Sequence, residues 1–130
     1  MNQTFTKDER LSSKLLIKML FDKGKKLNFF PFRITLLKYP IPSKSPVQLL
    51  ISVPRSLFRN AVDRNRIKRL IREAYRKNKN LLYEALEESH VQMLICFQYT
   101  PKEILSYQII QEKIILLLQR LKEENEEIIE

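Results

Sequence analysis

The sequence predicts an α+β fold, an α/β sandwich in which helices pack on a mixed sheet. Two patterns predict it. Apolar residues recur at three- and four-residue spacing in some segments, as on one face of a helix, whereas other short segments are rich in β-branched and aromatic residues, as in strands. Strands and helices are interspersed, and no repeat or low-complexity linker separates them. The 130 residues are therefore expected to form a single domain, residues 1–130.

Cap, turn and proline signals delimit the expected elements. Ser12 or Ser13 can cap a first helix that Gly24 ends, and Pro101 suits the first turn of the last helix. In chain order we expect a helix ending near 24, a turn at 28–31, strands at 32–39 and 47–53, a helix from about 60 to 78, its continuation or a separate helix at 81–88, a strand at 91–98 and a helix from 102 to about 125. The acidic stretch 120–130 is interpreted as a solvated helix end or tail.

The charge of the chain is strongly positive and unevenly distributed. The formal net charge is +9. Residues 54–79 hold ten Lys or Arg against two Asp or Glu, whereas residues 80–130 hold four against ten. Positive charge of this density indicates a polyanionic partner, either a nucleic acid or an anionic membrane surface. Because no signal peptide and no membrane-spanning apolar run is recognised, the expected location is cytoplasmic, with no segment spanning a membrane.

Catalysis by the polypeptide itself finds little support. The only cysteine, Cys96, lies in an apolar segment and is expected to pack as a small hydrophobic residue. The only histidine, His90, has no second His or Cys to complete a metal site with it. Gly24 is the only glycine, which excludes a Gly-rich phosphate loop. We therefore expect no catalytic residue, no metal site, no cofactor bound by the protein alone and no small-molecule substrate.

The densest basic segment, Arg64–Arg76, is predicted to form an amphipathic helix. At ~100° per residue, six polar residues fall within an arc of ~140°, and the apolar residues Ile67, Leu70, Ile71 and Ala74 lie opposite. The polar arc consists of Arg64, Asn65, Lys68, Arg69, Arg72 and Arg76, and Arg66 lies outside it, toward its far edge. Like charges four residues apart repel by roughly 0.2–0.5 kcal/mol per pair. A polyanion would offset this cost, and the arginine fork matches phosphate oxygens.

Charge alone leaves several alternatives open for this helix. One is a ribosomal-type or other structured-RNA-binding protein. Another is a DNA-binding protein that uses the basic helix as its recognition helix, although the arc offers mainly phosphate-type contacts and Asn65 is its one obvious base reader. A membrane-surface helix is disfavoured, because the apolar side of the helix is needed for the core.

Two runs of the sequence resemble the signature of the protein subunit of bacterial ribonuclease P. They are Ser52–Arg55 (SVPR) and Asn60–Arg76 (NAVDRNRIKRLIREAYR). The order Arg-Asn-Arg, Lys-Arg and Arg-Glu-Ala-Tyr-Arg is highly specific for that family. Similarity extends more weakly to Lys7–Leu11 and Phe21–Gly24, whereas the C-terminal third is similar in pattern only.

The resemblance implies a fold and a function. Family members have an α/β sandwich with a left-handed β-α-β crossover, similar to domain 2 of ribosomal protein S5 and contrary to the usual right-handed preference. They bind a large catalytic RNA and assist it in the endonucleolytic removal of the 5′ leader from precursor transfer RNA. The expected partners are ribonuclease P RNA and precursor transfer RNA with its leader. Mg²⁺ is expected in the holoenzyme, held largely by RNA.

The resemblance and the helical projection together give two sets of expected contact residues. Those for the catalytic RNA are Arg55, Arg64, Asn65, Arg66, Lys68, Arg69, Arg72 and Arg76. Those for a leader cleft between the first helix and the sheet are Ile17, Phe21, Phe32, Thr35 and Ser52. Stacking of a base on an aromatic ring contributes about 1–3 kcal/mol. Of the three positions where the family carries aromatic rings, 17, 21 and 35, only Phe21 is aromatic here, so Phe29, Phe30 or Phe32 is considered as a replacement.

Overall fold

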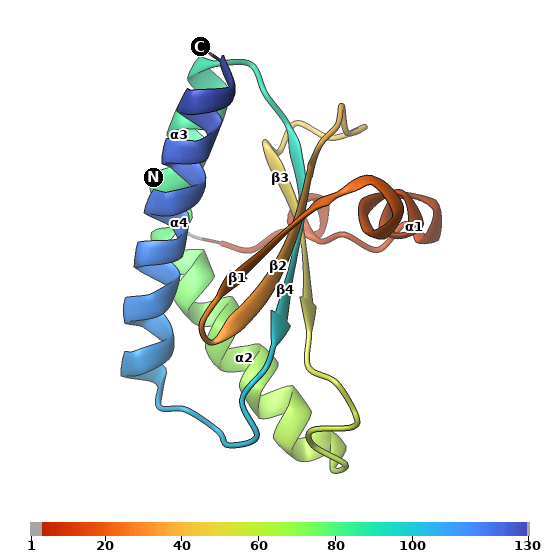
Figure 1. Cartoon of the computed structure of the whole chain (residues 1–130), viewed down its shortest axis with the longest axis vertical. Coiled ribbons are helices and arrows are strands. Elements are labelled where there is room, and N and C mark those ends of the chain that lie inside the picture. Colours follow the sequence, from red (N-terminus) through yellow and green to blue (C-terminus); the bar gives the residue numbers. More distant parts are fainter. Residues whose placement is uncertain (1–3, 130) are drawn as a thin grey trace.

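The protein folds as a four-stranded mixed sheet with helices on both faces (Figure 1). This computed structural model describes residues 4–129, with side chains up to residue 125. The elements are a 3-10 turn η1 (Lys7–Glu9), then α1 (Lys14–Lys23), β1 (Lys25–Phe29), β2 (Phe32–Lys38), β3 (Val47–Ser52), α2 (Ala61–Asn78), α3 (Asn80–Glu88), β4 (Met93–Tyr99) and α4 (Tyr107–Ile129). The strand order is β1-β2-β4-β3, in which only β3 and β4 are parallel neighbours.

The parallel pair forms the predicted β-α-β unit. Parallel neighbours need a long crossover connection, and here α2 and α3 supply it. In Figure 1, α2, α3 and α4 lie on one side of the sheet and α1 lies on the other. The predicted α/β sandwich, with helices packed on a mixed sheet and a β-α-β crossover, is therefore confirmed.

Side chains of β4 point alternately to the two faces of the sheet and so contribute to two separate hydrophobic clusters. Met93, Ile95 and Phe97 belong to the main cluster beneath α2, α3 and α4, whereas Leu94 and Cys96 belong to a smaller cluster beneath α1. Successive side chains of a strand point to opposite faces, so a strand covered on both faces is apolar at nearly every position. This explains the continuous apolar run that predicted β4.

The ends of α1 are set by Ser13 and Gly24, as predicted. The Ser13 hydroxyl accepts a hydrogen bond from Leu16 N at 3.3 Å. Gly24 has a φ of −71°, so its role is not a left-handed turn. A Cβ at Gly24 would lie 2.3 Å from Leu20 O and 2.8 Å from the Thr35 methyl carbon. The missing side chain therefore lets the end of α1 close directly onto β2.

Two predicted boundaries were wrong. Part of the predicted turn at 28–31 is strand, because β1 reaches Phe29. Only Leu27 and Phe29 of β1 turn inward, and Lys25 and Lys26 are exposed, so the short strand carries little apolar signal; lysines of this kind protect an edge strand.

The last helix begins at Tyr107 instead of 102. Ser106 accepts a hydrogen bond from Ile109 N at 3.3 Å, as an N-cap residue does. The residues before it are held by Tyr99, whose hydroxyl donates to Glu103 O at 2.7 Å and accepts from Leu105 N at 3.0 Å.

The acidic C-terminal stretch continues α4 as helix through Ile129, and Glu130 lies outside the described residues. Glu124 is paired within the fold. Its carboxylate lies 3.5 Å from Lys25 Nζ and 3.6 Å from Arg120 Nε. This acidic side chain thus ties α4 to the first strand.

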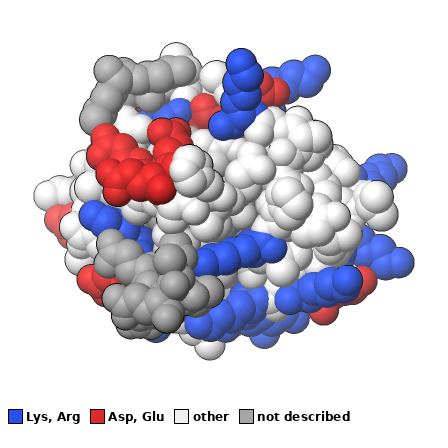
Figure 2. All heavy atoms as spheres, turned by 90° about the horizontal axis from the view of Figure 1, so that it is seen from above, with Lys and Arg blue, Asp and Glu red and all other residues white. Residues whose placement is uncertain are grey.

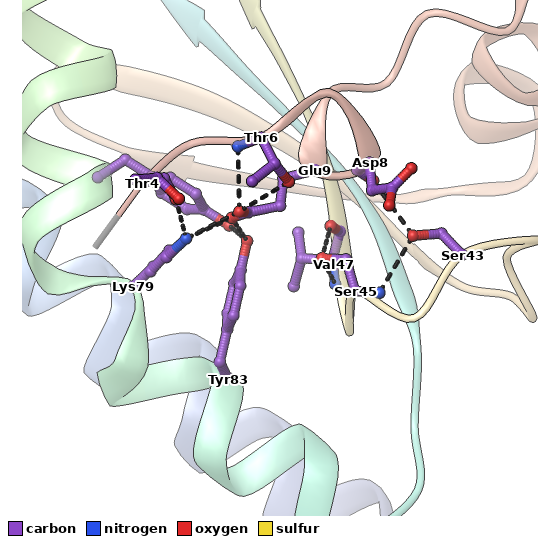
Figure 3. A network of polar contacts seen from close by, with 10 residues as sticks. Thr4, Thr6, Asp8, Glu9, Ser43, Ser45, Val47, Lys79 and Tyr83 are labelled. Carbon is purple, nitrogen blue, oxygen red and sulfur yellow. Dashed lines mark hydrogen bonds and ion pairs between the residues drawn. The ribbon is translucent and has the colours of Figure 1, made fainter. Parts of the chain in front are cut away.

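A buried ion pair fastens the N-terminal segment to the junction of α2 and α3 (Figure 3). Lys79 Nζ lies 2.7 Å from Glu9 Oε2 and also donates to Thr4 O. The same carboxylate accepts from the Tyr83 hydroxyl at 2.8 Å, and Tyr83 accepts from Tyr75 at 2.9 Å. Both members of the pair are buried, so the network fixes η1 against the helical layer.

Candidate nucleic-acid interface

Helix α2 places its basic residues on the outside by burying one apolar stripe. Ile67, Ile71, Ala74 and Tyr75 are buried against the sheet and α4. Leu70, predicted to lie on the buried side, is only half-buried, whereas Tyr75 is fully buried. The buried stripe is therefore rotated toward Arg64 relative to the prediction, because Tyr75 packs edge-on against Phe97 at 5.9 Å.

Two arginines of the predicted basic stripe hydrogen-bond to other residues of the protein. Arg64 Nη1 donates to Phe58 O at 2.7 Å and to Arg59 O at 2.8 Å. Arg76 binds Glu73 through two nitrogens, and the hydrogen bond from Arg76 holds the pKa of the Glu73 carboxyl below its usual value. Both arginines were predicted to contact the partner, but their internal acceptors on Phe58, Arg59 and Glu73 are not visible in the pattern of charges.

The other predicted contacts remain available. None of these side chains has a hydrogen bond or ion pair to another residue in the described part of the chain. They are Arg55, Asn65, Arg66, Lys68, Arg69 and Arg72. Arg72 also has a buried Nε without a partner. Because like charges here are not neutralised from within, the outer face of α2, defined by Asn65, Arg66, Lys68, Arg69 and Arg72, suits a polyanion.

Acidic and basic side chains are unevenly distributed on one face of the molecule (Figure 2). On the face shown in Figure 2, the largest group of acidic side chains lies to the left, whereas basic side chains line the lower and right margins. A surface of this kind attracts a polyanion to one part of the molecule and repels it from another.

The structure corrects part of the predicted leader cleft. Phe32 is buried in the main core, where its ring stacks on Phe97 at 5.4 Å, so it lies on the face of the sheet opposite α1. Thr35 does face α1 but is 5% exposed, since Gly24 lies directly over it. Because the strand period is two, positions 32 and 35 cannot share a face. Neither residue is accessible to a nucleotide.

The face of the sheet that α1 packs on is only partly covered. Its uncovered end carries four polar side chains instead of apolar ones. They form one row across all four strands, because Asn28 pairs with Arg33, Arg33 with Gln98, and Gln98 with Ser52. We call Asn28, Arg33, Gln98 and Ser52 the polar row. All four are exposed or half-exposed and make no side-chain hydrogen bond within the described residues. In Figure 1, α1 covers the other end of this face.

Only Ser52 of the polar row was among the predicted site residues. Arg33 and Gln98 could have been found from strand parity, since Arg33 lies two residues from Thr35 and Gln98 two from Cys96. Asn28 could not, because it lies in the stretch that was predicted as a turn. Pairing between strands, which decides that they form one row, is not visible in the sequence.

The two predicted cleft residues of α1 differ in accessibility. Ile17 packs partly on the smaller core, whereas Phe21 is 41% exposed. In a helical projection they lie about 40° apart, on the same flank as Lys14 and Lys18. Phe21 is therefore the aromatic side chain of α1 that a base can reach.

Other chemistry-bearing residues offer no competing site. Burial raises the pKa of the Cys96 thiol to about 11, which makes it a poor nucleophile. His90 is exposed in a turn with a φ of 56°. Among residues 4–129, no group of three or more His, Cys, Asp or Glu is placed to hold a metal ion. No helix in that range is long and apolar enough to cross a bilayer.

The four-stranded sheet thus carries the basic outer face of α2 and the open polar row. Residues 5–122 match the family model described as Ribonuclease P. The chain belongs to the ribonuclease P protein family. It is thus the protein subunit of a ribonucleoprotein endoribonuclease that processes transfer RNA, and its partner in the holoenzyme is RNA.

Individual ribonuclease P proteins support this membership. The chain is 37% identical over 109 residues to the ribonuclease P protein component of Porphyromonas gingivalis, covering 82% of this chain and 77% of that one. It is 31% identical over 126 residues to that of Chlorobium phaeobacteroides, covering 89% and 86%. The solved ribonuclease P protein of Thermotoga maritima superimposes with a TM-score of 0.68 at 26% identity, covering 86% of this chain and 96% of that one. A solved mutant of the Staphylococcus aureus RNase P protein, at 23% identity and a TM-score of 0.70, covers 89% of this chain and 90% of that one and shares the fold.

Proposed function

We propose that this ribonuclease P protein binds the catalytic RNA through the outer face of α2 and the single-stranded 5′ leader of precursor transfer RNA through the polar row. One observation carries the proposal: both surfaces lie at the same end of the sheet. Ser52 ends β3 at the polar row, and α2 begins only nine residues later, at Ala61. Figure 1 shows the first turns of α2 beyond this end of β3.

The two surfaces differ in the contacts they can make. The outer face of α2 presents mainly guanidinium and ammonium groups, which bind phosphates without reading sequence. The polar row offers amide and hydroxyl groups beside one guanidinium, and such groups can hydrogen-bond to the edges of unpaired bases. A folded RNA on α2 and a single strand on the polar row fit this division.

The proposed role of the protein is affinity and positioning, while the chemistry belongs to the RNA. The described residues bring no cluster of metal-binding side chains together, so the Mg²⁺ of the holoenzyme is proposed to be held by RNA. Neutralising phosphates with α2 lowers the repulsion that opposes a compact RNA, which is how the protein would stabilise the active RNA conformation. Since the RNA of a bacterial cell is in its cytoplasm, we propose that this is where the protein acts.

Reconstitution with a matching ribonuclease P RNA tests the proposed function. We expect the protein to reduce the Mg²⁺ concentration needed for cleavage of precursor transfer RNA, because its cations replace part of the counterion requirement. The gain should be greater for a precursor with a long leader than for one with a leader of a single nucleotide. Cleavage unchanged by the protein across the Mg²⁺ titration would refute the assisting role, and equal gains for both substrates would refute leader binding.

Phe21→Ala tests whether the exposed ring of α1 contacts the leader. Loss of one stacked base is worth about 1–3 kcal/mol, so binding of precursor transfer RNA should weaken by roughly 5- to 150-fold. Binding of mature transfer RNA, which has no leader, should change little. Leu15→Ala is the matched control, because Leu15 is 72% exposed on α1 but lies about 120° away in projection. Equal losses for the precursor and the mature RNA would remove Phe21 from the leader site.

A further inference from the structure

The connection between β3 and α2 is a short, tightly held loop that carries two outward-facing arginines. Pro54 O accepts hydrogen bonds from Leu57 N at 3.1 Å and from Phe58 N at 3.3 Å, which closes a turn. Phe58 is buried against Tyr99, with ring centroids 6.1 Å apart. Phe58 therefore anchors the loop to the core, while the side chains of residues 55 and 59 remain exposed.

The side chains of Arg55 and Arg59 have no hydrogen bond or ion pair within the described part of the chain. Together they extend the positive surface of α2 beyond its first turn, toward the polar row. Arg59 was not among the predicted contacts, because it precedes the helix and falls outside any helical projection. Its position is decided by the course of the loop backbone.

Arg64 holds the end of this loop that adjoins α2. Its Nη1 atom donates to the carbonyls of Phe58 and Arg59 at 2.7 and 2.8 Å, the last two before the N-cap residue Asn60. The Asn60 side chain makes no capping hydrogen bond. A cation in the first turn of a helix opposes the helix dipole, so its placement there requires compensation. The two charge-assisted hydrogen bonds to the loop provide it.

We propose that Arg64 is a positioning residue, which holds the loop so that Arg55 and Arg59 reach the RNA, and is not itself a phosphate contact. The inference rests on the proposed function, since it requires RNA to bind at this end of the sheet. It assigns different roles to the two arginines of the Arg64-Asn65-Arg66 sequence. Arg66 is exposed and without an internal partner, and it binds RNA directly.

A double-mutant cycle with a matching ribonuclease P RNA distinguishes the two roles. Arg64→Ala alone should weaken RNA binding about tenfold or more and lower the salt slope by about 1.4–1.8, as expected for two lost phosphate contacts. In the Arg55→Ala/Arg59→Ala background, Arg64→Ala should cost less than about twofold, because nothing remains to be positioned. Arg66→Ala is the matched control and should cause the same loss in both backgrounds. Equal losses for Arg64→Ala in both backgrounds would overturn the inference.

A second measurement does not depend on RNA. Amide hydrogen exchange of residues 55–60 should accelerate in Arg64→Ala and also in Arg64→Lys, because a single ammonium on a shorter reach cannot replace the guanidinium at both carbonyls. RNA affinity should remain low in Arg64→Lys; recovery by lysine would mean that charge alone matters and would overturn the inference. Wild-type affinity in Arg55→Ala/Arg59→Ala would also overturn it. The proposed contact of α2 with RNA would then still stand or fall with variants of its own outer face.

Discussion

Replacing Arg66, Lys68 and Arg69 together by alanine is expected to weaken binding of ribonuclease P RNA by roughly 100-fold, at about 1 kcal/mol for each lost charge-assisted contact. These side chains lie on the outer face of α2 and have no internal partner among the described residues. Their loss should therefore leave the fold intact, with a change in the free energy of unfolding within about 0.5 kcal/mol.

Salt titration of RNA binding is the measurement that identifies these contacts as phosphate contacts. The slope of log affinity against log salt should fall by about 2–3 in the triple variant. The control removes the same charge from three exposed lysines outside α2, through Lys44→Ala, Lys102→Ala and Lys122→Ala. If the control weakened binding as much as the α2 variant does, only the overall charge of the protein would matter, and the assignment of the α2 face would be wrong.

Lys79→Met is expected to lower the free energy of unfolding by about 3–5 kcal/mol, because it leaves the buried Glu9 carboxylate without its cation. Lys79 is 2% exposed and Glu9 is 5% exposed, so water cannot take the place of the lost ammonium. The whole free energy of unfolding of a typical domain is only about 5–15 kcal/mol. Urea unfolding followed by circular dichroism measures the difference.

Two further variants control this prediction. Arg76→Met breaks the ion pair between Arg76 and Glu73. Both of these side chains are partly exposed, so the free energy of unfolding should fall by less than about 1 kcal/mol. Lys79→Met/Glu9→Gln removes the buried charge while keeping an oxygen that can accept from Tyr83, and should regain part of the loss. If Lys79→Met and Arg76→Met were equally mild, the network at the α2–α3 junction would not contribute as proposed.

The same network predicts a dependence of stability on pH. Burial by itself would raise the pKa of the Glu9 carboxyl, but the hydrogen bonds from Lys79, Tyr83 and Thr6 outweigh it and hold the pKa below its ordinary value. Such a group stabilises the fold fully above its unfolded pKa of about 4.3, and this contribution is lost as the pH falls through the folded pKa. The stability difference between wild type and Lys79→Met should therefore shrink as the pH falls below about 4.3 and Glu9 becomes protonated. A constant difference would contradict the assignment.

Most of the fold could be predicted because its signals are local. Ser13 and Gly24 delimit α1, and prolines delimit the strands. β4 is covered on both faces, and every residue from Met93 to Phe97 is apolar and buried. β1 was missed because an edge strand with one apolar face and two lysines has no comparable signal. The start of α4 was placed too early because the hydrogen bonds of Tyr99 that hold the residues before it come from another element.

Charge density and helical periodicity are properties of one segment, so the amino-acid sequence sufficed to predict that α2 is basic on its outer side and that its partner is a polyanion. The order Arg64-Asn65-Arg66 also pointed to the correct family. The role of each cation became visible in the folded protein. The fold directs Arg64 to the loop carbonyls and buries Phe32 beneath α2 and α4. It also aligns four polar residues from four strands. These features could not be predicted because hydrogen bonds and strand register join residues that are far apart in the chain, and no local sequence pattern records such pairings.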